Sequence, residues 1–301
     1  VPGEARRPTG TVEQVTGDLV YLSGLNGAAP LWSHVKVVSQ EGQDSAELQI
    51  IKELDRYLVA RSLSGSSAAI RIHDRAELVR GGGPAPPQAA RTVVATRVAR
   101  GPKVDGILDD PVWDEAQSVG GFVQREPDYW MPATESVAAR IIYDDEQIYI
   151  GFECACADPA SIVANNMRRD SEIHGDDNVQ ILLDTYNDRQ TGFFFFVNPL
   201  GAKRDLMLSN EGRTYNEDWD CLWEARTTRH ARGWTAEISI PFSQLRYRPG
   251  ADAVWGINLA RHIACRSESA QLVVGRRSSS RLARYWTSDL AELSGLELAS
   301  P

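Results

Sequence analysis

Short segments in which apolar and polar residues alternate recur along the whole 301-residue chain. In residues 148–156, IYIGFECAC, every second side chain is apolar or a cysteine, and residues 233–242 and 254–263 alternate in the same way. Successive side chains of a strand point to opposite faces of a sheet, so a period of two indicates strands with one buried face. Helical signal is confined to a turn or two near residues 110–117 and 158–167. The sequence therefore predicts an all-β protein.

The spacing of these segments predicts two domains. Six short apolar stretches separated by turn-forming residues precede the segment RGGGPAPPQAA, whose Gly, Pro and Ala without periodicity are typical of a linker. At least seven strands follow it, which is the pattern of a jelly-roll-like, two-sheet antiparallel β-sandwich. The expected organisation is a flexible arm at residues 1–10, a small β-barrel at 11–80 with its last strand at 68–72, a linker at 81–92 and a sandwich at 93–301.

The distribution of charge argues against a nucleic-acid partner. Of the net charge of −9, little belongs to residues 1–90, which hold nine Lys or Arg against ten Asp or Glu. The remainder holds 23 basic against 31 acidic residues, so the second domain is the acidic one and suits cations or neutral ligands. The longest apolar run, at residues 193–197, is far too short to span a bilayer.

The four cysteines leave two alternatives open. Cys154 and Cys156 share the expected core face of one strand, where free thiols pack as small apolar groups. A disulfide from either of them to Cys221 or Cys265 is the alternative, and the even number of cysteines permits it. The Cys-Ala-Cys spacing differs from that of a zinc or redox motif.

Enzyme motifs are absent from the sequence. It contains no G-x-S-x-G, no H-E-x-x-H and no P-loop, and its five histidines lack metal-ligand spacing. Acidic residues are numerous, but a glycosidase pair depends on a separation that sequence does not give. We therefore expect no catalytic activity.

Four segments that follow one another in order carry a resemblance to a known family: VDGILDDPVWDEA, the stretch from FVQREPDYWMP to CACADP, RRDSEIHGDDNVQILLDTYNDRQTGFFFFVNPLGAKRD, and WDCLWEARTTRHARGWTAEISIPFSQLRY. Residues 95–298 resemble the family 9 carbohydrate-binding module-like domain of bacterial envelope proteins. The rhythm of residues 11–80, with GTVEQVTGDLVYL, resembles an SH3-like barrel of such proteins.

This resemblance implies a non-catalytic sandwich that binds sugars, often carries calcium and is located outside the cell or in the bacterial cell envelope. In xylanase-linked members two Trp clamp the sugar, and the position of the first is occupied here by His174. An acidic family residue on the following strand corresponds to Gln180, and an Arg on the next strand to Phe196. Trp286 lies near the region of the second Trp. The clamp itself is therefore not preserved.

Other glycan-binding candidates come from this sequence. A sugar offers an apolar ring face to an aromatic side chain and a polar rim to hydrogen-bonding groups. We expect such contacts from three segments, whose alternative role is packing and structural ion pairing. Their candidate residues are Tyr129 and Trp130, then Asn198 and Arg204, and then Tyr215, Trp219 and Trp223. If residues 219–223 form a strand, the two Trp share one face.

Calcium is the one cofactor that we predict, and a solvated acidic loop is the alternative. The segment RRDSEIHGDDN contributes Asp170, Asp176 and Asp177, and calcium takes six to eight oxygen ligands. The spacing is not that of an EF-hand.

The segment DGILDDPVW predicts a structural role. Asp109 and Asp110 stand before Pro111, where Asp commonly satisfies backbone N–H groups of a turn. We expect Trp113 to plug one end of the sandwich. A metal site at Asp105 or Asp109 is the alternative.

Two functional hypotheses follow. The first is a secreted or envelope glycan-binding protein. The second is a structural extracellular protein that assembles with copies of itself into a filament or surface layer, with glycan as ligand or covering. In that case the polar arm VPGEARRPTG could add to the sheet edge of a neighbour.

Overall fold

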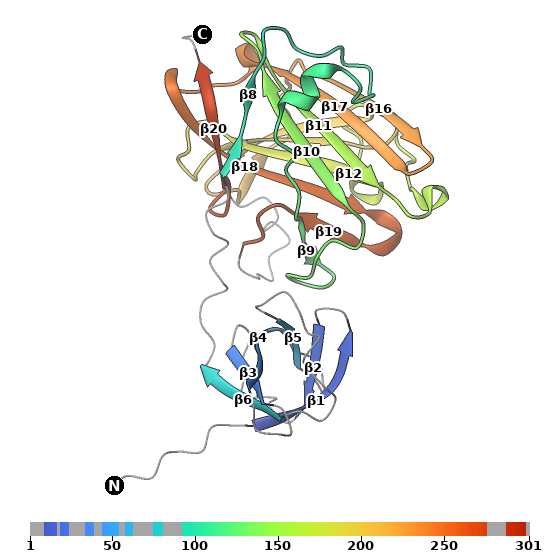
Figure 1. Cartoon of the computed structure of the whole chain (residues 1–301). Coiled ribbons are helices and arrows are strands. Elements are labelled where there is room, and N and C mark those ends of the chain that lie inside the picture. The colour runs from blue at the N-terminus through green and yellow to red at the C-terminus, as the bar shows by residue number, and fades with distance from the viewer. Residues whose placement is uncertain are drawn as a thin grey trace. The chain divides into compact units, whose positions relative to one another are not determined.

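The chain divides into two compact units, Val1–Ala89 and Ala90–Pro301, which are described separately. The structure, a computed structural model, describes residues 9–16, 19–23, 34–38, 44–53, 58–62, 75–80, 92–275 and 287–298. Figure 1 shows both units, in which strands dominate and helices are single short turns. The expected all-β class is confirmed.

The first unit is a closed antiparallel barrel in which the strand order is β1-β2-β5-β4-β3-β6. Its strands are β1 (Thr9–Thr16), β2 (Leu19–Ser23), β3 (His34–Val38), β4 (Asp44–Glu53), β5 (Leu58–Ser62) and β6 (Arg75–Arg80). Alternate side chains such as Val12, Leu22 and Val35 are fully buried inside it. The strand expected at residues 68–72 lies outside the described residues, and the barrel closes through β6 instead. Its likeness to an SH3 barrel stays a prediction.

The second unit is a sandwich of two sheets. The smaller sheet has the order β16-β17-β11-β10-β8. Its strands are β16 (Glu224–His230), β17 (Gly233–Pro241), β11 (Gln147–Ala155), β10 (Val137–Tyr143) and β8 (Thr96–Arg97). All neighbours are antiparallel except β8, which runs parallel to β10.

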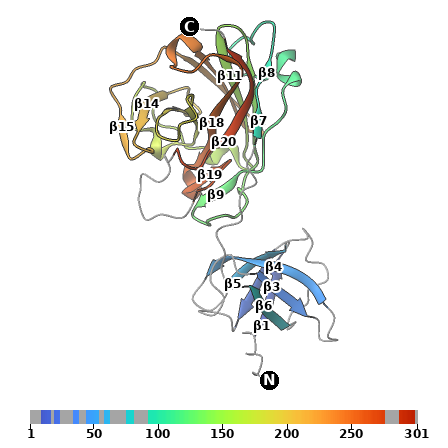
Figure 2. The ribbon, with the colours of Figure 1, turned by 90° about the vertical axis from the view of Figure 1, so that its left-hand side faces the viewer.

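The larger sheet has the order β15-β14-β13-β12-β18-β19-β9, and β20 pairs with both β18 and β7. The strands are β15 (Thr214–Asn216), β14 (Lys203–Ser209), β13 (Gly192–Val197), β12 (Asn178–Asp184), β18 (Gly250–Ile263), β19 (Glu268–Gln271), β9 (Val123–Glu126), β20 (Ala291–Leu298) and β7 (Thr92–Val94). Figure 2 shows β14 and β15 at one edge of this sheet. Single turns of 3-10 helix connect the strands: η1 (Pro111–Glu115), η2 (Pro159–Ser161), η3 (Ile173–Gly175), η4 (Phe242–Gln244) and η5 (Ala264–Arg266).

One apolar core fills the space between the two sheets. It takes Ile148, Ile150, Phe152 and Cys154 from one face of β11, as the alternation predicts. The larger sheet contributes the inward side chains of β12, β13 and β18 in the same way. Cys156 joins this core too. All four cysteines are free thiols, of which Cys265 alone is exposed.

A second apolar layer covers the outer face of the smaller sheet, and the segment DGILDDPVW forms much of it. Trp113 on η1 is 1% exposed and packs on Ile142 and Tyr149, which point away from the main core. The prediction that Trp113 plugs one end of the sandwich was therefore wrong. The Asp110 side chain does not cap the turn at Pro111; its carboxylate instead accepts a hydrogen bond from the backbone N–H of Lys103, seven residues earlier, at 2.9 Å.

Glu237 on β17 attaches this segment to the sheet. Its fully buried carboxylate accepts hydrogen bonds from the Trp113 indole at 2.9 Å and from the backbone N–H groups of Asp105 and Gly106 at 2.8 and 2.7 Å. Gly106 has a φ of +92°, and a Cβ there would meet the Thr227 backbone at 2.8 Å, so only glycine fits. The sequence alone gives no sign of this three-way contact.

No helix in residues 92–275, or elsewhere in the described part of the chain, has the length and apolar character to cross a membrane.

We predict that Glu237→Ala lowers the free energy of unfolding by about 2–4 kcal/mol, because it leaves buried N–H donors without an acceptor. Glu153→Ala is the matched control, since Glu153 is an exposed glutamate of the neighbouring strand β11 and pairs with Thr235 on β17. Urea unfolding of the full chain gives both values. Equal effects of the two substitutions would contradict the proposed role of Glu237.

The same carboxylate gives a pH prediction. Burial raises the pKa of Glu237 above its ordinary value of 4.5, although the three donors oppose this effect. The folded state then holds this proton more strongly than the unfolded state, so ionisation of Glu237 costs stability. The free energy of unfolding of the wild type should fall, relative to that of Glu237→Gln, as the pH rises from below 4.5 through the raised pKa. Parallel pH curves for the two proteins would refute this assignment.

Candidate functional site

The outer face of the larger sheet carries a row of mainly polar side chains. From β14 to β19, the strand register places these residues side by side: Arg204, Phe196, Gln180, Ala260 and Gln271. They point away from the main core because their neighbours along each strand, such as Val179 and Ile181 on β12, belong to it. Five strands thus bring together residues that are distant in the sequence.

A second polar row runs beside the first and borders a small cavity. Its members are Asn178, His262, Ser269 and Glu126, which are neighbours across β12, β18, β19 and β9. These four line a cavity of about 40 Å³ together with His174, Gln180 and Arg125. A cavity of this size holds water molecules rather than a sugar ring, so a glycan would contact these groups from outside.

His174 lies above the sheet at the edge of this cavity. The turn η3 brings its half-exposed imidazole over Phe196, with 5.3 Å between ring centroids and an interplanar angle of 82°. Beneath it, Leu182, Phe194 and Leu206 form an apolar layer on the outer face. Two residues predicted from the family resemblance, His174 and Gln180, therefore line the same cavity.

Arg204 connects two loops across this face. Its side chain is 6% exposed and forms ion pairs with Glu172 at 2.8 Å and with Glu217 at 2.5 Å. Both glutamates are largely exposed, so water screens each pair. Arg204 thus takes part in structural ion pairs, the alternative role expected for its segment. The next residue, Asp205, points to the opposite face because adjacent strand residues alternate.

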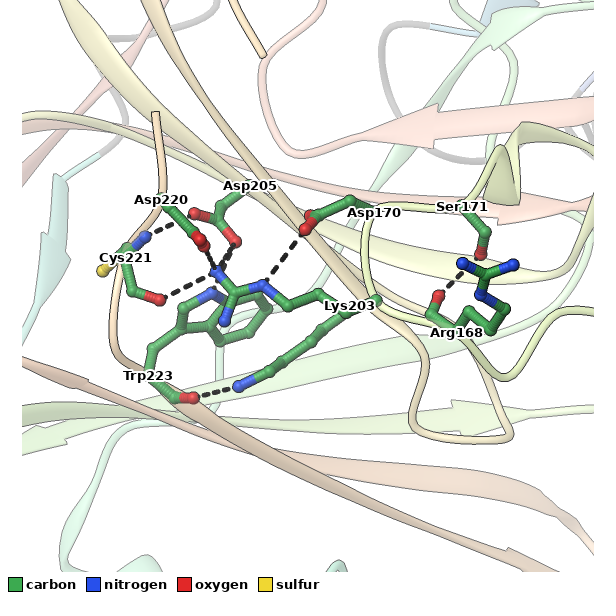
Figure 3. Close-up of polar contacts among 9 residues, drawn as sticks. Arg168, Asp170, Ser171, Lys203, Asp205, Asp220, Cys221 and Trp223 are labelled. Carbon is green, nitrogen blue, oxygen red and sulfur yellow. Dashed lines mark hydrogen bonds and ion pairs between the residues drawn. The ribbon is translucent and has the colours of Figure 1, made fainter. Parts of the chain in front are cut away.

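On the inner face of the same sheet, Asp205 also connects two loops (Figure 3). It accepts hydrogen bonds from the Trp223 indole at 2.9 Å, the Cys221 backbone N–H at 2.8 Å and Arg169 at 2.8 Å. Arg169 also contacts Asp220 and donates to the Cys221 carbonyl at 2.9 Å. Burial raises the pKa of Asp205, and these donors act against that effect. The loops before β12 and after β15 are thus held together.

The Trp219–Trp223 segment is a loop between β15 and β16, so the argument that these residues share a strand face does not apply. Trp223 is 3% exposed and packs against Phe195 with ring centroids 5.1 Å apart. Lys203 lies over the Trp223 ring at 5.0 Å. Trp223 has no free face for a sugar, whereas Trp219 is half-buried against Phe193.

The remaining aromatic candidates differ in accessibility. Tyr129 is buried and donates to the Gly275 carbonyl at 2.7 Å, which matches the packing alternative. Trp130 is half-buried, edge-on to Tyr129. Tyr215 on the edge strand β15 is 44% exposed and is the most accessible of the described candidates. Trp286 lies outside the described residues.

The acidic loop residues predicted for calcium do not converge on one point. Asp176 is 1% exposed, and its two oxygens accept five hydrogen bonds from Asn165, Asn166 and Asn198. Asp177 accepts from the backbone of Val163 at 3.0 Å. Asp170 pairs with Arg169 at 3.2 Å.

The oxygens of Asp176 are therefore already occupied by protein N–H donors. Within the ranges that the structure describes, no three His, Cys, Asp or Glu side chains are arranged to hold a metal. Calcium binding stays a prediction that this geometry does not support. Asn198 is fully buried and also holds its own turn, since its carbonyl oxygen accepts from Leu200 and Ala202.

Sequence reasoning missed most of the cavity lining. Arg125, Glu126, Asn178, His262 and Ser269 were not predicted as site residues. Alternation would have assigned Asn178 to the same face as Gln180, two residues along β12. The others come from β9, β18 and β19, and their proximity depends on strand pairing that no local pattern reveals.

The comparisons with known proteins concern this second unit. The family model described as carbohydrate family 9 binding domain-like matches residues 104–270. A family 9 carbohydrate binding module from Caldicellulosiruptor kristjanssonii, solved with cellotriose, is 19% identical over 70% of this chain and 95% of that chain, with a TM-score of 0.51. A second structure from that organism, with glucose, is 16% identical over 70% and 98%, with a TM-score of 0.49.

A protein from Bacteroides uniformis ATCC 8492 is 12% identical over 68% of this chain and 98% of that chain, with a TM-score of 0.52. No curated protein matches the chain. At these identities the likeness to solved structures shows the fold of the sandwich.

We predict that Asp176→Ala destabilises the protein by about 2–4 kcal/mol, because it leaves several buried N–H donors without an acceptor. Asp252→Ala is the control, because Asp252 is an exposed aspartate of β18 that belongs to no candidate site. Thermal unfolding with and without a chelator separates the two roles of Asp176. A loss that is the same in both conditions supports hydrogen bonding. A chelator effect on the wild type that disappears in Asp176→Ala would show a metal ligand instead.

The pH dependence of this effect has a defined sign. Burial alone would raise the pKa of Asp176, but the hydrogen bonds from Asn198, Asn165 and Asn166 outweigh it and lower the pKa below 3.8. The stabilisation is then complete above the unfolded-state pKa and is lost as the pH falls through the lowered value. The difference between wild type and Asp176→Asn should shrink only below pH 3.8.

Proposed function

Because this chain belongs to the carbohydrate family 9 binding domain-like family, we propose that its second unit binds glycan on the outer face of the larger sheet. The activity is binding without catalysis. The supporting observation is that His174 and Gln180, which the family resemblance suggests as ligand positions, line one cavity. A relative with the same fold was solved with cellotriose, so short glucans are the first ligands to test.

Hydrogen bonding would dominate recognition at this face. Gln180 offers its amide oxygen and one amide N–H, Glu126 offers a carboxylate, and Arg125 offers a guanidinium. Asn178 is fully buried and positions Gln180 instead, because its amide donates to the carbonyls of Ile173 and Asp176 and accepts from Gln180 at 2.8 Å. Sugar hydroxyls match such a mixed set, and charged partners strengthen the individual bonds.

Stacking would contribute less than in members with a Trp clamp. His174 offers less apolar area than an indole, and its ring already packs edge-to-face with Phe196. Tyr215 is exposed at the β15 edge of the sheet, and Trp130 follows β9 at the opposite edge. We therefore expect weak affinity and a dependence on polar contacts more than on one aromatic platform.

The cellular location and assembly state are part of the proposal. An envelope or extracellular glycan is the natural ligand for a domain of this kind, so we propose that the protein acts outside the cell or in the bacterial cell envelope. Assembly with copies of itself is the alternative function, and the glycan test below decides between them.

We predict that Gln180→Ala and His174→Ala each weaken glycan binding about threefold to tenfold, the equivalent of roughly one hydrogen bond. A broad glycan array, followed by calorimetric titration of cellotriose, glucose and any array hit, measures this. Gln117→Ala is the matched control, because Gln117 is an exposed glutamine that follows η1 on the smaller sheet.

Two outcomes would count against the proposal. If the wild type binds glycan and both cavity variants bind it equally well, the binding face is elsewhere. If the wild type binds nothing on the array, self-assembly becomes the leading function, and the oligomeric state of the chain with and without residues 1–10 is the next measurement.

A further inference from the structure

A second and larger cavity lies at the other end of the sandwich. It measures about 570 Å³ and is formed where the β10–β11 turn, the end of β17 with η4, and the end of β20 meet. Leu298, in its lining, pairs with Gly250 at the start of β18, whereas His262 of the glycan-binding face is near the end of β18. This volume falls in the range of sites for small organic molecules.

The rim of this cavity is strongly acidic. Four carboxylates line it, from Asp144, Asp145, Glu146 and Glu297, and Arg97 is its one described basic residue. Arg97 is shared between Asp145 at 2.6 Å and Glu297 at 3.4 Å. The side chains of these two acids are 83% and 62% exposed, so both can reorient toward a ligand.

Asp144 has a different role from the other three acids. Its oxygens accept hydrogen bonds from the backbone N–H groups of Gly101, Glu146 and Gln147 and from the Tyr149 hydroxyl, all within 3.1 Å. Its pKa is lowered by these bonds despite burial, so it stays charged without offering a free oxygen. Asp144 thus contributes negative potential and fixes the turn that carries Asp145 and Glu146.

The floor of the cavity is apolar and aromatic. Phe242 is 5% exposed and its ring centroid is 5.9 Å from that of Tyr247, which is half-buried. Tyr247 in turn rests on Trp255, again with 5.9 Å between centroids. The rings are thus held in place by the main core, and the Tyr247 side chain stays partly accessible beside the carboxylates.

We propose that this cavity binds an organic cation, namely an ammonium group on a small apolar or pyranose body. Carboxylates at the rim attract the positive charge, and aromatic faces attract it through their quadrupole while covering the apolar body. The excess of carboxylates disfavours anionic ligands. This site is separate from the glycan-binding face and does not depend on that proposal.

Titration calorimetry of the full chain at low ionic strength tests the proposal with two pairs of ligands that match in shape and differ in charge. Choline is compared with 3,3-dimethylbutan-1-ol, its neutral isostere, and glucosamine with glucose. The proposal requires millimolar binding of at least one cation and weaker binding of its neutral counterpart. Binding of choline alone identifies a free alkyl ammonium as the ligand class, and binding of glucosamine identifies an amino sugar.

Substitutions then locate the site through effects of opposite sign. Glu297→Gln and Asp145→Asn should each weaken cation binding about two- to fivefold, as expected for partly exposed charges. Arg97→Gln should strengthen it by a similar factor, because it frees both carboxylates. Tyr247→Leu keeps an apolar side chain but removes the aromatic face, and should weaken binding about threefold or more.

Glu153→Gln removes one exposed negative charge from β11 outside the cavity and is the control for net charge. Unfolding curves of all variants confirm that each is folded. The proposal is overturned if neither cation binds, or if the neutral isosteres bind as well as the cations. It is also overturned if Glu297→Gln, Arg97→Gln and Glu153→Gln all have the same effect.

Discussion

Two adjacent residues of β14 hold the loops at one end of the sandwich from both sides of the sheet. Arg204 points outward to Glu172 and Glu217, and Asp205 points inward to Arg169 and to the 220–223 loop. Arg204 is buried, but both of its glutamate partners are exposed to water, which screens these outer pairs, whereas loss of the buried Asp205 would leave several donors without an acceptor. The inner contacts therefore stabilise these loops, and the outer pairs orient them. His174 stands on the first loop, so its place over Phe196 depends on both.

Much of the fold follows from local sequence. The alternation in residues 148–156 assigns Ile150 and Cys154 to the core, and the structure places them there. The family positions of His174 and Gln180 could also be found from sequence, because one short motif contains both. Such inferences succeed where a strand or a single loop carries all the information.

The remainder of the site depends on contacts between distant segments. Glu126, Asn178 and His262 become neighbours through the pairing of four strands. The sequence of a single strand does not determine the register of this pairing. Trp223 was expected to be available for a sugar, because residue spacing alone does not distinguish a strand from a loop. In the structure its indole N–H donates to the buried Asp205, so the ring lies in the core. Trp113 was assigned to an end of the sandwich because its acceptor, Glu237, lies 124 residues away.

The pairing of β7 with β20 has a consequence for how the protein is made. Thr92 lies opposite Glu292, 200 residues further along the chain, and β20 is the one partner recorded for β7 among the described strands. The first strand of the sandwich, β7, can form its strand hydrogen bonds only after the last strand, β20, is present. Contacts between residues so distant in sequence form slowly. On the ribosome the barrel emerges first and has all six of its strands early, while the sandwich stays open at this edge until synthesis passes Leu298.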